Sequence, residues 1–182
     1  MYVSELKTRL RKINGTKIVL IESCHSGGFA TLSQGRILLE NEIAHEQELF
    51  VQDIMTVFDE EETEEGSRGT YETPYEFYAL ASSSTSQSSS SDPLLGNSVF
   101  PFYLADGLGG VSTLKALLGT YDGTYDADGY GSGNVRNGAI TFSEIYQYTK
   151  DKVQNHATQI IIRQTVQANH GDSGFIFANY AQ

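Results

Sequence analysis

One cysteine and its neighbours are the first place where this sequence could do chemistry. Residues 17–30, KIVLIESCHSGGFA, contain Cys24, the only cysteine in the chain. The apolar run 18–21 predicts a strand buried on both faces of a parallel sheet. Ligands bind outside the carboxyl ends of such strands. The glycines that follow Cys24 let backbone N–H groups approach its sulfur, and these N–H groups would lower the thiol pKa and could hold an oxyanion. Cys24 is therefore either a nucleophile at a strand end or a buried apolar residue, as free cysteines usually are.

The elements that must position this segment follow from hydrophobic spacing. Strands alternate with helices, which predicts one layered α/β domain over residues 1–182. Ser4 is the expected N-cap of the first helix, and Thr141 with Glu144 forms a capping box for the last. The expected elements are helices over 3–13, 41–58, 99–110 and 141–155, and strands over 18–21, 75–81 and 175–178.

Three polar segments separate these elements. Residues 59–70 are strongly acidic and predict a solvated loop, and residues 121–138, rich in Gly and Asp, predict a second loop. Residues 82–92 are rich in serine. This composition is typical of a flexible linker, but its position after a strand also suits a substrate-binding loop.

Composition excludes several classes of function. A net charge of -11 argues against nucleic acid or an anionic membrane surface as a partner and suits a cationic substrate. A single cysteine excludes a disulfide framework and a thiolate zinc cluster. No segment is long and apolar enough to cross a membrane, and the N-terminus lacks the apolar core of a signal peptide.

An apolar strand followed by ESCHSGG resembles the nucleophile segment of the caspase-like (clan CD) cysteine peptidases, in particular the bacterial metacaspase, clostripain and legumain branch. That branch often has Asp where this chain has Glu22, although legumains also place Glu there. The resemblance is sharp at the cysteine and looser over most of the chain, where the order and spacing of helices and strands are similar. It implies a caspase-like (caspase–haemoglobinase) three-layer α/β fold with a mainly parallel sheet, the N-terminal strands lying outside this chain.

The resemblance also implies roles for individual residues. Cys24 would attack the scissile carbonyl and form an acyl-enzyme that water resolves. Glu22, two residues earlier, would line the pocket for the side chain before the cut, where a carboxylate favours Arg or Lys. The alternative for Glu22 is an ordinary surface carboxylate. Ser82 and Ser83 match the strand end that pairs with the substrate backbone.

The catalytic base is missing from the expected position. In the caspase-like family a His-Gly pair lies about 50 residues before the cysteine, but none of the 23 residues before Cys24 is histidine. His25 points to a different side from its neighbour, His45 falls on the second helix, and His156 is expected in solvent after a helix end. His170 precedes a glycine but lies far downstream. The resemblance therefore implies an N-terminal light chain, separated by autoprocessing and carrying the histidine; a truncated chain would look the same.

A calcium site is a further hypothesis. Residues 137–144 match the second half of an EF-hand loop, but Gly133 and Val135 occupy ligand positions in the first half, and Asp126 and Asp128 could replace them only through a longer loop. Asp126, Asp128 and Glu144 are the candidate ligands, although the capping box already accounts for Glu144. No cofactor is required, and calcium is considered only as an activator, as in some metacaspases and clostripain.

The leading interpretation is a secreted bacterial thiol protease, a hydrolase that cleaves after Arg or Lys and is incomplete as this chain alone. Secretion is inferred from the bacterial resemblance. Two alternatives remain: a caspase-like pseudoenzyme or interaction module that has lost its histidine, and an unrelated α/β binding domain with a structural cysteine.

Overall fold

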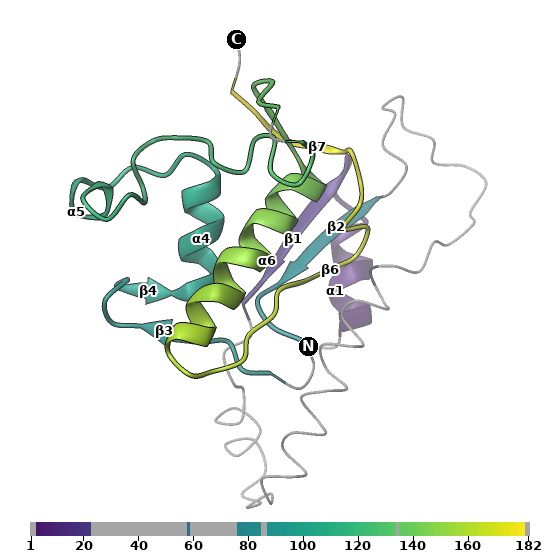
Figure 1. Ribbon diagram of the computed structural model, residues 1–182. Helices are drawn as coiled ribbons and strands as arrows, with labels where there is room; N and C mark the ends of the chain where they lie inside the picture. Colours follow the sequence, from purple (N-terminus) through teal and green to yellow (C-terminus); the bar gives the residue numbers. More distant parts are fainter. Residues whose placement is uncertain (1–2, 23–57, 59–75, 85–86, 134, 181–182) are drawn as a thin grey trace, which may run out of the picture.

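The computed structural model describes residues 3–22, 58, 76–84, 87–133 and 135–180 (Figure 1). Within them the chain forms four helices and three small sheets, a mixed α/β architecture. The helix expected over 41–58, apart from its helical and buried last residue Phe58, and the loop expected over 59–70 lie outside the described residues.

A three-stranded sheet lies at the centre. Strands β1 (Lys17–Ile21) and β2 (Phe77–Ala81) are parallel and in register, whereas β6 (Gln167–Ala168) pairs with β2 antiparallel. The parallel pair confirms both predicted strands and brings their carboxyl ends to one edge. The central sheet therefore combines a parallel pair of five residues with a short antiparallel pair of two, and both smaller sheets are antiparallel.

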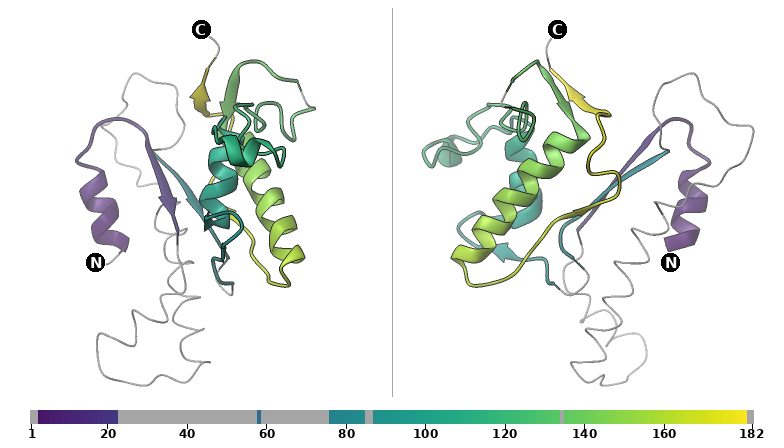
Figure 2. Two further views of the ribbon diagram at one scale, coloured as in Figure 1. Left: turned by 90° about the vertical axis from the view of Figure 1, so that its left-hand side faces the viewer. Right: turned by 45° about the vertical axis from the view of Figure 1, so that its right-hand side comes forward.

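Helices cover the central sheet on both faces. Figure 2 shows α1 (Val3–Leu10) on one side and α4 (Val99–Gly107) with α6 (Phe142–Gln159) on the other. All five residues of β2 are buried, and they alternate between two cores: Phe77 and Ala79 pack towards α1, and Tyr78 and Leu80 pack in the cluster that contains α4 and α6. Because successive side chains of β2 point to opposite faces of the sheet, this one strand packs against the helical layers on both sides.

Strand β1 is less buried than its sequence predicts. Val19 and Ile21 pack in the core on the α1 side, but Ile18 and Leu20 are 40% and 49% exposed. The expectation of a strand buried on both faces is therefore wrong for β1. The core cluster that contains α4 and α6 includes side chains of β2 but none of β1, which explains the difference.

The predicted capping box at the start of α6 is confirmed. Thr141 Oγ1 accepts a hydrogen bond from Glu144 N at 3.2 Å, and Thr141 N donates to Glu144 Oε2 at 2.8 Å. The helix ends at Gln159, later than expected. At the other end of the chain the expected N-cap is wrong, because α1 begins at Val3 and Ser4 lies within it.

Several short elements have no counterpart in the expected pattern. The serine-rich segment runs into a hairpin of β3 (Ser91–Asp92) and β4 (Asn97–Ser98), and α5 (Thr113–Ala116) lies on an excursion after α4. The last strand, β7 (Ile176–Asn179), is confirmed, but it pairs with β5 (Ala139–Thr141) rather than with the central sheet. The loop expected over 121–138 is also confirmed, and none of the described helices is long and apolar enough to cross a membrane.

Candidate functional site

The carboxyl edge of β1 and β2 brings together the predicted substrate-binding residues. Ser82 N donates to Ile21 O at 2.9 Å, which extends the parallel ladder by one residue beyond the strands. Glu22 and Ser82 therefore leave adjacent strands side by side, and Ser83 follows. Glu22 is exposed, whereas Ser82 and Ser83 are 0% and 1% exposed. The edge thus presents a carboxylate beside two buried hydroxyl groups.

The nucleophile predicted from the sequence lies outside the described residues, as do His25 and His45. The last described residue before Cys24 is Glu22, two positions earlier. The structure therefore places the strand end that leads to Cys24.

The two serine hydroxyls have no hydrogen-bond partner among the described residues. Their backbone is held by a residue that sequence reasoning missed: Gln164, which is 1% exposed and donates from Nε2 to Ser82 O at 2.9 Å. Nothing in the local sequence around Gln164 marks it, because its partner lies 82 positions away. The serine-rich segment is consequently packed into the protein where it leaves β2, and the flexible-linker interpretation is wrong for Ser82 and Ser83.

His156 is held inside the protein, contrary to expectation. Its Nε2 lies 2.9 Å from Asp92 Oδ2 and its Nδ1 lies 3.1 Å from the Tyr103 hydroxyl. The prediction of a solvated residue is wrong because α6 continues past His156 and directs it onto β3 and α4. Burial, then the nearby charges of Asp106 and Asp92, raise the pKa of Tyr103, so its hydroxyl stays protonated. With both ring nitrogens engaged, His156 is a structural residue.

His170 lies at the other end of β2. Its ring centroid is 6.0 Å from that of Tyr78, and Tyr78 precedes Ser82 by four residues, about 13 Å of strand. Strand β6 runs antiparallel to β2, so the chain moves away from the carboxyl edge as it approaches His170. Neither histidine of the described residues is therefore placed to act as a base at that edge.

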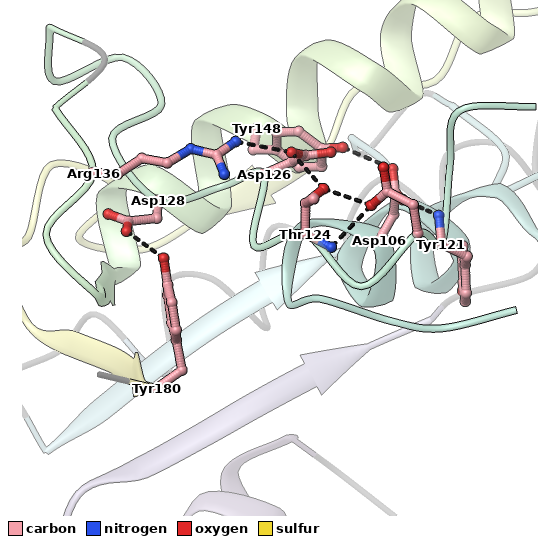
Figure 3. Close-up of polar contacts among 9 residues, drawn as sticks. Asp106, Tyr121, Thr124, Asp126, Asp128, Arg136, Tyr148 and Tyr180 are labelled. Carbon is pink, nitrogen blue, oxygen red and sulfur yellow. Dashed lines mark hydrogen bonds and ion pairs between the residues drawn. The ribbon is translucent and has the colours of Figure 1, made fainter. Parts of the chain in front are cut away.

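Acidic and tyrosine side chains join α4, α6 and the loop 121–138 (Figure 3). Asp106, 3% exposed, accepts from the Tyr148 hydroxyl at 2.7 Å and from Tyr121 N at 2.7 Å. Burial and this hydrogen bond raise the pKa of Tyr148 far above its ordinary value. The hydrogen bond between Asp106 on α4 and Tyr148 on α6 links the two helices on one side of the sheet.

The three carboxylates considered for calcium bond to different protein groups. Asp126 pairs with Arg136 at 3.0 Å, while Asp128 and Glu144 accept the hydrogen bonds that close the loop. The donors to these two are Asn137 N, Gly138 N and the Tyr180 hydroxyl for Asp128, and Gly129 N, Ser132 Oγ, Thr141 N and Thr141 Oγ1 for Glu144.

These bonds explain the electrostatics of the loop. Burial alone would raise the pKa of Asp128, but the hydrogen bonds from Tyr180, Gly138 and Asn137 outweigh it and lower the pKa below the ordinary value. Over the described part of the chain, no three His, Cys, Asp or Glu side chains are grouped to hold a metal ion. The carboxylates therefore have a clear structural role, and the calcium hypothesis gains no support from their arrangement.

Comparison of the chain with protein-family models, with curated proteins and with solved structures finds no match. The strand edge must therefore be interpreted from its own geometry and from the residues that surround it.

Proposed function

We propose that this chain is the nucleophile-bearing part of a cysteine endopeptidase that hydrolyses peptide bonds after Arg or Lys. The observation that carries the proposal is the parallel register of β1 and β2, continued by the Ser82 N to Ile21 O hydrogen bond. It sets Glu22, two residues before the only cysteine, beside buried hydroxyls without partners in the described chain. A caspase-like arrangement of nucleophile, specificity carboxylate and substrate-backbone segment requires this adjacency.

In the proposed reaction the Cys24 thiolate adds to the scissile carbonyl carbon. The C–N bond then breaks, the leaving amine takes a proton from the protonated base, and the acyl group remains on sulfur as a thioester. Water, deprotonated by the same base, adds to the thioester carbonyl; the C–S bond breaks, and the thiolate and the carboxylic product are released. No metal takes part in these steps.

Specificity for a basic side chain would come from Glu22. An ion pair between exposed groups contributes only about 0.2–1 kcal/mol, which corresponds to at most about fivefold in rate. Glu22 is exposed in the structure, so strong selection for Arg requires that residues outside the described part close over the pair. A preference for Arg greater than a hundredfold in cleavage rate would thus indicate a closed pocket around Glu22, whereas a preference of a few fold would indicate an open one.

The base must come from outside the described residues, since His156 is engaged through both nitrogens and His170 lies at the opposite end of β2. We propose a histidine on an upstream segment or on a separate light chain of a secreted bacterial enzyme. The same observation favours a second candidate function, a caspase-like interaction module without peptidase activity.

Alkylation and cleavage assays test the proposal. Because Cys24 is the only cysteine, iodoacetamide at neutral pH reports on it alone, and rapid labelling is expected of an activated thiolate. In the full natural protein, Cys24→Ala should abolish the cleavage of fluorogenic peptides that end in Arg or Lys, while Glu22→Gln should weaken cleavage after Arg and leave folding unchanged. Rapid labelling without cleavage supports the interaction module, and slow labelling without cleavage supports a structural cysteine. Equal turnover of peptides that end in Asp would overturn the basic specificity.

A further inference from the structure

The segment that follows β2 concentrates unsatisfied polar atoms. Ser82 Oγ, Ser83 Oγ, Gln87 Oε1 and Ser89 Oγ are buried without a hydrogen-bond partner in the described residues, and they are four of five such side-chain atoms there. A buried polar atom left unpaired costs about 1–3 kcal/mol, and folded proteins contain few of them. Four such atoms therefore lie close together in sequence, in the segment that leaves the carboxyl end of β2.

The same segment is fastened at both ends by one buried amide. Gln164 Nε2 donates to Ser82 O at 2.9 Å, and Gln164 Oε1 accepts from Ser90 N at 3.1 Å. Both bonds go to backbone atoms, so Gln164 does not use the hydroxyl groups of Ser82, Ser83 and Ser89. Gln164 uses the donor and the acceptor of its amide at once and is 1% exposed, so it fixes the distance between the two ends of the segment.

We propose that Gln164 is a positioning residue for peptide binding: it holds the segment so that the unpaired side-chain atoms of Ser82, Ser83, Gln87 and Ser89 bond the main chain of an extended peptide. Serine hydroxyls both donate and accept, and Gln87 Oε1 accepts only, which suits the alternating C=O and N–H groups of a peptide in strand conformation. This inference rests on the proposed function for the identity of the ligand. It adds Gln164, Gln87 and Ser89 to the residues that recognise substrate.

The test measures binding and turnover separately. The binding arm uses the full natural protein carrying Cys24→Ala, which cannot cleave, with a fluorescein-labelled tetrapeptide ending in Arg and fluorescence polarisation as the readout. Gln164→Met, close in shape and unable to make either bond, should weaken binding about tenfold, the loss of one to two hydrogen bonds. Gln164→Glu keeps the acceptor and loses the donor, and it should weaken binding by a similar or smaller factor.

Asn169 provides a matched control. It is also a buried amide, 5% exposed, directly after the short strand β6 that Gln164 precedes, and its Oδ1 accepts from Ala79 N at 2.6 Å, away from the carboxyl edge. Asn169→Leu should lower stability as much as Gln164→Met but leave the affinity for the tetrapeptide within twofold of its starting value.

Turnover separates positioning from catalysis. With the active cysteine restored, Gln164→Met should raise KM for the tetrapeptide substrate about tenfold and leave its kcat within twofold. For a second substrate, an amide of arginine alone, Gln164→Met should change neither KM nor kcat. Unchanged affinity in both folded Gln164 variants, an equal effect on both substrates, or no tetrapeptide binding at all would overturn the inference. Tetrapeptide binding that depends on Gln164 in a protein that cleaves nothing would uphold the inference and refute the proposed peptidase.

Discussion

Just past the end of helix α6, Ile161 is poorly suited to its backbone conformation. Ile161 has φ of +60°, and the two hydrogen bonds of a Schellman motif surround it: Ile161 N to Thr158 O at 3.2 Å and Ile162 N to Ala157 O at 2.9 Å. Glycine is the usual residue at this position, because a Cβ in the left-handed region costs about 1–2 kcal/mol and a β-branched side chain is especially unfavourable there. The Ile161 side chain is 94% exposed, so its replacement forfeits almost no burial.

Ile161→Gly should therefore stabilise the protein. Relief of about 1–2 kcal/mol is partly offset by about 0.5–1 kcal/mol for the greater freedom of glycine in the unfolded chain. The expected net gain is about 0.5–1 kcal/mol, or about 1–4 °C in Tm for a chain of this length. Urea unfolding followed by circular dichroism should show a higher midpoint with an unchanged m value.

Neighbouring substitutions serve as controls. Ile160 has an ordinary φ of -97° at the C-cap and is 37% exposed, so Ile160→Gly adds unfolded-state freedom, also loses side-chain burial, and should destabilise by at least about 0.5–1 kcal/mol. Ile161→Ala keeps a Cβ in the left-handed region and should gain less than Ile161→Gly. If Ile161→Gly is neutral or destabilising, like Ile160→Gly, the strain assigned to this helix end is refuted.

Three further predictions concern the polar network and the acidic loop. Tyr148→Phe removes a donor from the buried Asp106 carboxylate and should cost about 1.5–3 kcal/mol in urea unfolding; a loss below 0.5 kcal/mol would contradict the pairing. Tyr180→Phe removes the 2.6 Å hydrogen bond to Asp128 and should lower the free energy of unfolding at pH 7. The folded pKa of Asp128 is lowered, so the stability that this carboxylate contributes is present above its unfolded pKa of about 4 and is lost as pH falls through the folded pKa. The free energies of unfolding of the variant and the parent should therefore become equal in acid. Millimolar calcium should leave Tm equal to that in EDTA, since protein groups already bond the carboxylates of residues 126–144, and a rise of several degrees would reveal a site.

Local patterns in the sequence were sufficient to predict the helices and strands that have strong hydrophobic periodicity or a capping motif. The helix opened by Thr141 and Glu144, the buried strand β2 and the loop 121–138 all follow from residues close together in the chain. The two-residue strands β3, β4 and β6 carry no comparable signal, because so short a stretch has no period to detect. Their positions depend on contacts with other parts of the chain.

The candidate site shows the same limit. Placement of Glu22 beside Ser82 follows from the parallel register of β1 and β2; the sequence predicts the two strands, but not that they are neighbours. Burial of Ser82 does not follow, because serine is usually exposed and its anchor, Gln164, is distant in sequence. The inward position of His156 likewise depends on Asp92, 64 residues earlier.

The pairing of β1 with β2 also has a consequence during synthesis. Lys17 pairs with Phe77, so sixty residues of chain separate the partners (77 − 17). At about 5–20 residues per second, a ribosome makes the second partner about 3–12 s after the first. Throughout this interval the apolar residues 18–21 lack β2, the strand with which they pair in the described part of the chain. For several seconds of synthesis, the β1 edge that β2 later covers is therefore open to chaperones.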